Sequence, residues 1–341
     1  MGRARKPIVS ILIVSYNTRE LTIAAIDSVV RETTVPYEII VVDNNSTDGS
    51  PEAIAAHQAA PRLIAHKENL GFARANNLAA RYAQADILLL LNPDTIVLDH
   101  AIDRLVEFAK ERPLARIWGG RTLFANGELN PSSCWQRISI WSTFCRTVGL
   151  AAIFSNSQYF NTEAIGGWPR DSVREVDIVS GCFFMIPRSL WRELGGFDPT
   201  FFMYGEEADL CLRAQRLGAS PAITPRATII HLGGASERTR AAKMIKLLAA
   251  KITLIERHLP MWQRPIARQF MRLWPLTRMI ALSTASHVRH SEKLSQGAGQ
   301  WREVWNRRDE WQNGYRSIPA ELAEASNTLV NTSPTLKPNT H

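Results

Sequence analysis

Cysteine is scarce in this chain and is not arranged to bind metal. The 341 residues include four cysteines, with no Cys-x-x-Cys spacing and no matching pair of histidines. We therefore expect no zinc site, and we interpret the cysteines as reduced thiols in a cytosolic protein. Long hydrophobic runs are also missing. Because no stretch reaches ~18 uncharged apolar residues, we expect no helix that spans a membrane.

Acidic residues are few in the last third of the chain. Residues 236–341 contain 17 lysines and arginines against 8 aspartates and glutamates, whereas residues 1–235 contain 23 against 24. This asymmetry indicates an anionic partner, either a membrane surface or nucleic acid. The basic N-terminus is similar to the start of a secretion signal, but the apolar run 8–14 is short and no cleavage-like site follows it. We interpret this run as a β-strand.

Strand-like and helix-like segments alternate through the first 120 residues. The expected strands are 8–14, 38–42, 62–65 and 86–91, and the expected helices are 20–31, 51–59, 72–84 and 100–111. This alternation predicts an α/β fold, with a mostly parallel sheet covered by helices on both faces. In such sheets, ligands bind beyond the carboxyl ends of the strands.

The rest of the chain divides into less regular parts. Residues 125–175 are expected to form loops that shape a pocket. We then expect strands at 176–186 and 228–231, helices at 188–194, 206–217 and 240–259, and a short basic helix bracketed by Pro265 and Pro275. The predicted domains are 1–236, a helical extension 237–317, and a tail 318–341 whose polar composition predicts disorder.

A carboxylate follows the most apolar of these strands. Asn92-Pro93-Asp94 comes directly after residues 86–91. A hard cation such as Mg²⁺ or Mn²⁺ takes one or two carboxylates together with diphosphate oxygens, which makes Asp94 a candidate ligand. The same residues are also a common strand terminator. His231 ends the last expected strand, where a neutral imidazole can complete a metal site, although a lone histidine is more often structural.

Two further polar segments are candidates for chemistry. The loop 43–50 begins with Asp43, which can accept a hydrogen bond from a nucleotide base, and it equally fits an Asx turn before a helix. Glu206 and Glu207 begin an expected helix, where one carboxylate can serve as general base, or where acids simply favour the helix dipole. Asp209 lies four residues before Arg213, and we interpret that spacing as a surface ion pair.

The order of these segments resembles the inverting glycosyltransferases of family 2, which have the GT-A fold. The resemblance extends from about residue 9 to residue 236. It rests on the blocks 14–17, 42–50, 69–77, 91–95, 179–182, 195–198, 201–211 and 231–236. The sequences of these blocks are most similar to those of the rhamnosyltransferase-like branch, which builds bacterial cell-surface polysaccharide.

The resemblance implies a role for each matching position. Glu207 would be the catalytic base, and Asp94 and His231 would bind the metal. The donor-binding residues would be Ser15, Asn17, Asp43, Asn45, Arg74, Asn77 and Asn92, and the candidate acceptor contacts are Trp168, Arg170 and Glu206. The family usually has Glu-Asp where this chain has Glu206-Glu207, so the base is one methylene longer.

The implied reaction is an inverting sugar transfer that depends on Mg²⁺ or Mn²⁺. The expected donor is dTDP-L-rhamnose, and the expected acceptor is a lipid-linked sugar or a growing polysaccharide. A UDP- or GDP-sugar donor and a non-catalytic nucleotide-sugar-binding partner are alternatives. A nucleotidyltransferase is disfavoured because residues 14–17 lack a glycine-rich loop with a basic residue.

The basic segment 262–280 suggests where the protein works. Arg264, Arg268 and Arg272 share one helical face, and Trp262, Phe270 and Trp274 lie nearby. This arrangement suits an anionic membrane surface, or a helix packed on the catalytic domain with its arginines in solvent. We expect a cytoplasmic protein that is peripheral on the inner face of the membrane, with no nucleic-acid partner.

Overall fold

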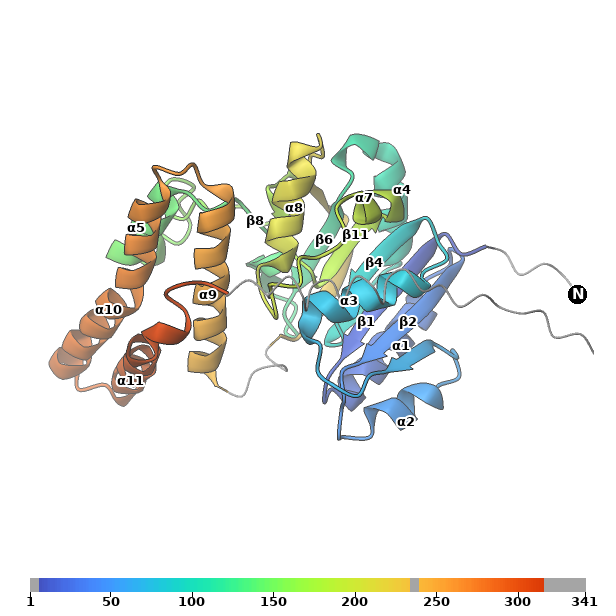
Figure 1. The fold of residues 1–341 in the computed structure, drawn as a ribbon, viewed down its shortest axis with the longest axis horizontal. Helices are drawn as coiled ribbons and strands as arrows, with labels where there is room; N and C mark the ends of the chain where they lie inside the picture. Colours follow the sequence, from blue (N-terminus) through green and yellow to red (C-terminus); the bar gives the residue numbers. More distant parts are fainter. Residues whose placement is uncertain (1–5, 234–238, 316–341) are drawn as a thin grey trace, which may run out of the picture.

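The computed structural model describes residues 6–233 and 239–315, and its centre is a mixed β-sheet (Figure 1). Six of the eight strands on the main path of the sheet point in one direction, and β11 and β5 are reversed. The prediction of a mostly parallel sheet is therefore confirmed. The path runs β3 (Arg62–Ala65), β2 (Tyr37–Asp43), β1 (Val9–Ser15), β4 (Ile87–Leu91), β11 (Phe183–Pro187), β6 (Trp118–Leu123), β12 (Ala222–His231) and β5 (Thr95–Val97).

Short strands and turns extend this framework. β7 (Leu129–Asn130) pairs with β6, and β9 (Arg174–Glu175) pairs with β12. A separate two-stranded sheet joins β8 (Cys134–Trp135) to β10 (Ile178–Val179). Short 3-10 turns lie at η1 (Pro113–Ala115), η2 (Pro131–Ser133) and η3 (Arg308–Glu310).

Helices cover both faces of the sheet, because successive side chains of a strand point to opposite faces. Val9, Ile11 and Ile13 of β1 pack with α1 (Arg19–Glu32), α2 (Ser50–Ala55) and α4 (Ala101–Glu111). Leu12 and Val14 face the other layer, which contains α3 (Gly71–Tyr82), α7 (Arg188–Glu193) and α8 (Glu206–Arg216). The nearly continuous apolar sequence of β1 follows from this burial on both faces.

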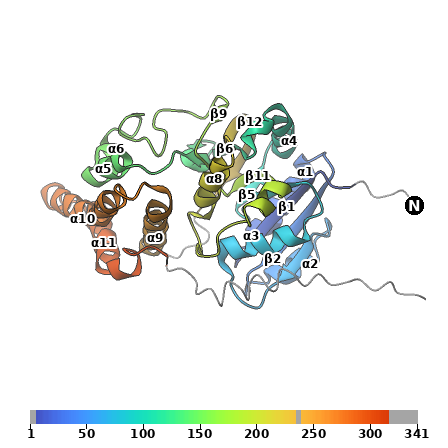
Figure 2. The same ribbon diagram turned by 45° about the horizontal axis from the view of Figure 1, so that its top comes forward.

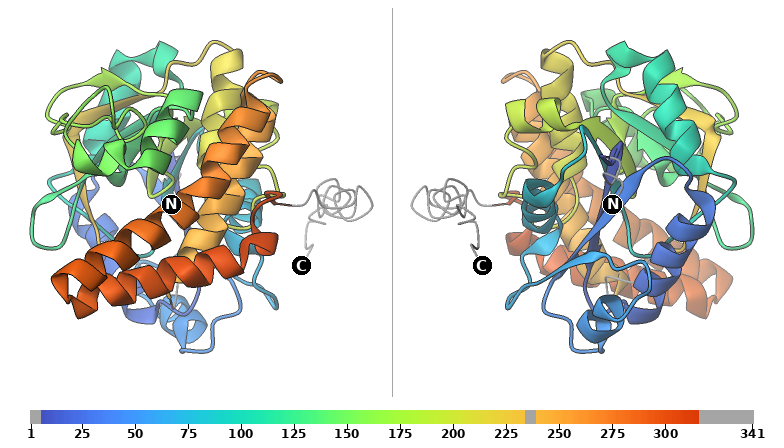
Figure 3. Two further views of the ribbon diagram at one scale, coloured as in Figure 1. Left: turned by 90° about the vertical axis from the view of Figure 1, so that its left-hand side faces the viewer. Right: turned by 90° about the vertical axis from the view of Figure 1, so that its right-hand side faces the viewer.

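A group of helices lies at one end of the molecule (Figures 1 and 3). It contains α9 (Arg240–His258), α10 (Arg264–Arg289) and α11 (Glu292–Asn306). Two helices from the irregular middle of the chain, α5 (Ile140–Val148) and α6 (Leu150–Ile153), lie beside α10 (Figure 2). The rings of Phe144 and Phe270 are 5.5 Å apart, and the Thr147 hydroxyl donates to the Phe270 carbonyl at 2.7 Å. The middle segment is therefore built onto the helical extension.

Several expected boundaries were wrong. The strand expected at 176–186 is interrupted at Ser180-Gly181-Cys182, because β10 pairs with β8 whereas β11 joins the main sheet. The short helix expected to end at Pro275 is the long helix α10, which runs through this buried proline. Packing of α10 against α5, α9 and α11 offsets the hydrogen bond that a proline removes from a helix.

The aromatic face expected for membrane contact is also different. Trp274 is buried and Phe270 is half-buried, so both face the protein. None of the helices in the described part of the chain combines the length and apolar character needed to cross a membrane. The predicted disordered tail lies outside the described residues, as does the predicted domain boundary at 236.

Candidate active site

The parallel strands bring several of the predicted site residues to one edge of the sheet. Ser15 at the end of β1 pairs with Asp43 at the end of β2, and β4 runs parallel to β1 on its other side. Asn92 follows β4 directly, so the residues after these three strands meet at the same edge. This is the edge at which such sheets bind ligands.

The loop that follows β2 is tied closely to the loop that follows β1. The Asp43 carboxylate accepts hydrogen bonds from the Ser46 amide at 2.9 Å and from the Ser46 hydroxyl at 2.6 Å. An Asx turn lies further along the loop, where the Asp48 carboxylate accepts from the Ser50 amide at 3.1 Å. The Asn17 side chain accepts from the Thr47 amide at 2.8 Å. Asn17 and the exposed Asn45 both have positive φ, a conformation that asparagine tolerates better than most residues. The two loops therefore form one rigid polar rim.

Two of the predicted donor-binding residues are engaged inside the protein. Ser15 is buried, and its hydroxyl accepts a hydrogen bond from Thr22 at 3.2 Å. The Asn77 side chain donates to the Phe197 carbonyl at 2.8 Å and accepts from the Phe197 backbone N–H at 2.9 Å. These two bonds fix the turn at Gly196. Arg74 lies one turn earlier on α3, and its side chain forms no hydrogen bond or ion pair with any described residue.

A histidine and a carboxylate come together at the end of β4. Strand pairing places His231 of β12 opposite Thr95 of β5, next to Asp94. The His231 Nε2 atom lies 3.3 Å from the Asp94 Oδ1 atom and 3.3 Å from the Asn92 side-chain amide. Burial alone would lower the pKa of His231, but the adjoining Cys182 and Asp94 side chains raise it to about 10.

Asp94 and His231 are too few to hold a metal ion by themselves, but they could hold one together with a bound substrate. The described residues contain no group of three or more histidine, cysteine or acidic side chains that would hold a cation alone. Two buried polar atoms, Asn92 Oδ1 and His231 Nδ1, have no hydrogen-bond partner. Mg²⁺ and Mn²⁺ are usually held by one or two protein ligands together with phosphate oxygens of a substrate. Asp94 fits that chemistry, and His231 fits it in its neutral form, when a cation takes the place of the ring proton.

Glu206 and Glu207 begin α8, directly after Gly205 in the left-handed conformation. Each carboxylate has a buried Oε2 atom that finds no hydrogen-bond partner among the described residues. Burial raises the pKa of both groups, and the Glu207 charge raises the pKa of Glu206 further. The pKa of Glu206, which is buried, is raised further than that of Glu207, which is half-buried. A buried polar atom without a partner is uncommon and calls for a functional reason.

The interrupted segment Ser180-Gly181-Cys182 joins the two halves of the site. The Cys182 carbonyl accepts a hydrogen bond from the Asn92 amide at 3.1 Å. A Cβ atom on Gly181 would lie 3.8 Å from the Glu207 Cβ atom and 3.3 Å from the Phe72 ring. We expected a continuous strand here, and we assigned these three residues no role in joining the site. The glycine between two polar residues was the available signal of a break.

The expectation for Asp209 was right about its partner but wrong about its location. Asp209 forms the predicted ion pair with Arg213 at 2.7 Å, yet only 1% of the residue is exposed. Its second oxygen lies 2.8 Å from His258 Nε2, on α9. This buried network ties α8, which carries both glutamates, to the helical extension.

The comparison with known proteins decides the family. Residues 10–195, more than half of the chain, match the profile of glycosyl transferase family 2. The chain belongs to this family. The expectations of a transferase and of its rhamnosyltransferase-like character are confirmed by the relatives.

This glycosyltransferase has two relatives whose names state a rhamnosyl transfer and a role in O-antigen biosynthesis. It is 26% identical over 286 residues to the N-acetylglucosaminyl-diphospho-decaprenol L-rhamnosyltransferase of Mycobacterium tuberculosis, covering 76% of this chain and 86% of that protein. It is 28% identical over 241 residues to the O-antigen biosynthesis protein RfbC of Myxococcus xanthus, covering 69% of this chain but 18% of that protein.

A solved structure shares the fold of this glycosyltransferase. The mannosyltransferase PcManGT from Pyrobaculum calidifontis, in complex with GDP-Man and Mn²⁺, superposes with a TM-score of 0.56 and 16% identity. The match covers 90% of this chain and 88% of that one. This likeness confirms the expected GT-A-like architecture.

Of the three residues predicted to contact the acceptor, Trp168 and Arg170 lie in the loop before β9, and Glu206 lies at the start of α8. Arg170 is 2% exposed, and its guanidinium donates to the carbonyls of Trp168 (2.6 Å), Ala164 (2.7 Å), Ile165 (3.1 Å) and Pro131 (3.2 Å). Arg170 thus organises the loop before β9. Trp168 and Arg170 both line a cavity of ≈ 670 Å³ in this loop, whereas Glu206 lies beside the base.

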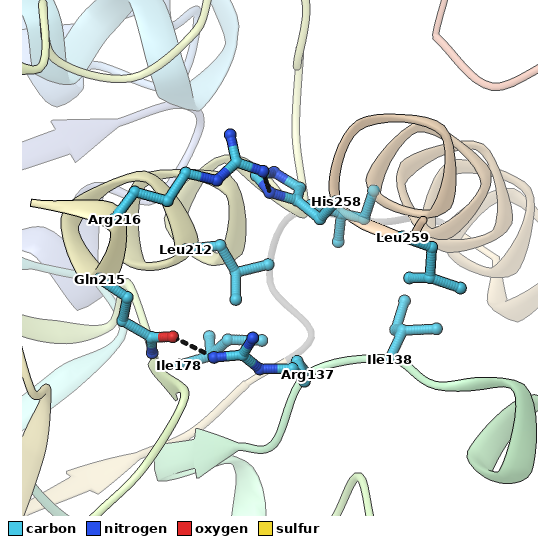
Figure 4. A pocket seen from close by; sticks show the side chains of 9 residues that line it. Arg137, Ile138, Ile178, Leu212, Gln215, Arg216, His258 and Leu259 are labelled. Carbon is cyan, nitrogen blue, oxygen red and sulfur yellow. Dashed lines mark hydrogen bonds between the residues drawn. The ribbon is translucent and has the colours of Figure 1, made fainter. Parts of the chain in front are cut away.

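A smaller cavity of ≈ 240 Å³ lies between the C-terminal ends of α8 and α9 (Figure 4). Leu212 and Ile178 form its apolar wall, and Arg137 and Arg216 lie at its rim. Arg216 bonds His258 Nδ1 at 3.1 Å, while Arg137 pairs with Asp177 at 2.8 Å. Because Glu207 is at the opposite end of α8, this cavity is separate from the site described above.

Proposed function

We propose that this glycosyltransferase moves L-rhamnose from dTDP-L-rhamnose to a hydroxyl of a sugar on a lipid diphosphate, with inversion at the anomeric carbon. The observation that carries the proposal is the Glu207 carboxylate at the start of α8, whose buried Oε2 atom has no hydrogen-bond partner among the described residues, together with the nearby pair of Asp94 and His231. The choice of sugar and acceptor is supported by similarity to the M. tuberculosis L-rhamnosyltransferase, whose name specifies a diphospho-decaprenol-linked N-acetylglucosamine.

The reaction is a single displacement at the anomeric carbon of the donor. Glu207 accepts the proton of the acceptor hydroxyl while the acceptor oxygen forms its bond to that carbon. The bond from the carbon to the diphosphate breaks, and its electron pair leaves with the nucleoside diphosphate. A raised pKa makes ionised Glu207 a stronger base than an exposed glutamate. Protonated Glu206 can donate a hydrogen bond to the acceptor.

The donor would lie across the edge formed by the ends of β1, β2 and β4. Asp43, Asn17 and Asn45 form the polar rim that supports nucleotide binding. Arg74 supplies a guanidinium without a partner among the described residues, suited to a phosphate oxygen. Asp94 and His231, with Asn92 beside them, would hold Mg²⁺ or Mn²⁺. When bound, that cation would neutralise charge on the leaving diphosphate.

A donor panel tests this function. Purified enzyme is given dTDP-, UDP- and GDP-sugars with Mg²⁺ or Mn²⁺ and an undecyl-diphosphoryl N-acetylglucosamine acceptor, and nucleoside diphosphate release is measured. We expect acceptor-dependent release from dTDP-L-rhamnose that stops after chelation and in Asp94→Ala. Faster acceptor-dependent release from a UDP- or GDP-sugar would overturn the choice of donor.

Exposed side chains of the helical extension support our proposal that the enzyme works at an anionic membrane surface. Met261 and Trp262, in the turn before α10, are 80% and 68% exposed, and Ile266 follows on the first turn. Exposed aromatic and apolar side chains among arginines are typical of interfacial segments. The double variant Met261→Ser, Trp262→Ser should lose sedimentation with phosphatidylglycerol vesicles, while Tyr82→Ser, an exposed residue of α3, should not. Unchanged sedimentation of the double variant would contradict this location.

A further inference from the structure

Three basic side chains from different helices converge beside the helical extension. Arg146 of α5, Lys251 of α9 and Arg278 of α10 come from helices that lie side by side (Figures 1 and 2). Arg278 donates to the Arg146 carbonyl at 3.1 Å, and Arg146 and Lys251 both pair with Glu163. We call Arg146, Lys251 and Arg278 the basic cluster.

The basic cluster carries more positive charge than neighbouring carboxylates balance, and the Arg146 guanidinium also lies over the Trp274 ring, 5.1 Å from its centre. Glu163 is the one carboxylate among the described residues that pairs with any member, so three cations face a single anion. The side chains of Arg146 and Lys251 are 24% and 17% exposed, and the Arg146 Nε atom is buried without a partner. Burial lowers the pKa of Lys251 and of Arg278. Poorly solvated cations in excess favour an anionic ligand.

The position of the cluster relative to Glu207 suggests which anion. Ala250 precedes Lys251 on α9, and a Cβ atom on Gly205 would lie 3.0 Å from the Ala250 methyl group. Gly205 comes directly before Glu206 and Glu207 at the start of α8. The start of α8 therefore packs against α9 one residue from Lys251, and we place the far end of a bound acceptor sugar toward α9. In a lipid-linked acceptor, that end carries the diphosphate.

We propose that the basic cluster binds the diphosphate of the lipid-linked acceptor. This inference rests on the proposed function and adds the residues that recognise its acceptor. Guanidinium and ammonium groups form charge-assisted hydrogen bonds with phosphate oxygens, and the two arginines can engage them in pairs. Glu163 holds Arg146 and Lys251 in place, and its negative charge offsets part of the repulsion among the three cations before an anion binds.

Calorimetric titration of the full chain with two matched ligands tests the proposal. One ligand is undecyl-diphosphoryl N-acetylglucosamine, and the other is undecyl N-acetylglucosaminide, which lacks the diphosphate. We expect the wild type to bind the first at least about tenfold more tightly, and Arg278→Met and Lys251→Met each to reduce this preference about tenfold. Arg268→Met, on the same helix and paired with Glu256, is the control and should keep the preference.

Two outcomes overturn the proposal. The first is equal affinity of the wild type for the two ligands. The second is an equal loss of affinity for both ligands in the variants, which would make the cluster a purely structural latch. Arg278→Met leaves both Glu163 ion pairs intact, so it decides the matter even if Lys251→Met does not fold. Affinities are measured without donor, so absence of sugar transfer would refute the proposed function without affecting this test.

Discussion

The sharpest prediction compares Glu207→Gln with Glu206→Gln. Both substitutions keep the size of the side chain and remove its ability to ionise. Both residues occupy the same helix terminus, and each has one buried oxygen without a partner. Because Glu206 is buried whereas Glu207 is half-buried, and burial raises the pKa of Glu206 further, we assign the negative charge of the pair to Glu207. The two variants should therefore have very different effects on the chemical step.

Removal of a general base typically costs about 10²–10⁴-fold in rate. We expect kcat of Glu207→Gln to fall by that factor, which corresponds to a transition-state destabilisation of about 2.7–5.5 kcal/mol. Glutamine in place of a protonated Glu206 keeps a neutral hydrogen-bonding group, so kcat should stay within about fivefold of wild type.

The assay is steady-state release of nucleoside diphosphate with saturating donor and acceptor, alongside donor binding and thermal melting of each variant. Donor binding should be unchanged in both variants, because neither residue contacts the donor in this account. Equal losses in the two variants would refute the division of roles. A Glu207→Gln enzyme with nearly full kcat would refute the assignment of the base.

Three further predictions concern pH and stability. Burial raises the pKa of Glu207 above its ordinary value of 4.5, so kcat/KM should decline as pH falls through that raised pKa and the base becomes protonated; a pH profile flat down to 4.5 would contradict this. Burial would raise the pKa of Glu163, but Arg146 and Lys251 hold it at about 2, so its stabilising contribution is complete above pH 4.5 and is lost between 4.5 and about 2. Glu163→Gln should cost about 3 kcal/mol in urea unfolding at pH 7, and a cost below ~1 kcal/mol would contradict this. Gly196→Ala should lower the free energy of unfolding by about 2–3 kcal/mol, because φ is +73° and the new Cβ would lie 2.4 Å from Asn77 Oδ1. Gly195→Ala, with φ of +72° and open space around the new Cβ, should lower it by about 1 kcal/mol. Equal losses in the two variants would show that the contact with Asn77 is unimportant.

The first half of the fold was predictable from local sequence. β1 and β2 differ from their expected bounds by one residue at each end, and β3 matches at both ends. These strands are buried on both faces, so apolar runs mark them clearly and polar loops mark their ends. β12 begins at Ala222, before the expected start at residue 228. Its first half was missed because it contains Pro225 and lies at an irregularity in the pairing with β6.

The second half depended on contacts between distant segments. α5 forms in a segment with mixed composition because it packs on α10, more than a hundred residues later. Pro275 was expected to end a helix, but tertiary packing continues α10 past it. Local sequence carries no signal of either contact.

The sequence motifs named candidate site residues, which remain predictions, but they could not give the arrangement of those residues. The distance between His231 and Asp94 depends on the pairing of β12 with β5, which connects residues far apart in the sequence. The same holds for Asn77, whose partner Phe197 lies 120 positions away. Motif order supplied the identities, whereas the division of charge between Glu206 and Glu207 required their burial.

The most direct test of the central claim is the anomeric configuration of the product, measured by proton and carbon NMR on material made from dTDP-L-rhamnose and undecyl-diphosphoryl N-acetylglucosamine. A single displacement assisted by Glu207 predicts a rhamnosyl product whose anomeric configuration is opposite to that of the donor. A product that retains the donor configuration would contradict direct attack by the acceptor hydroxyl, and with it the role assigned to Glu207.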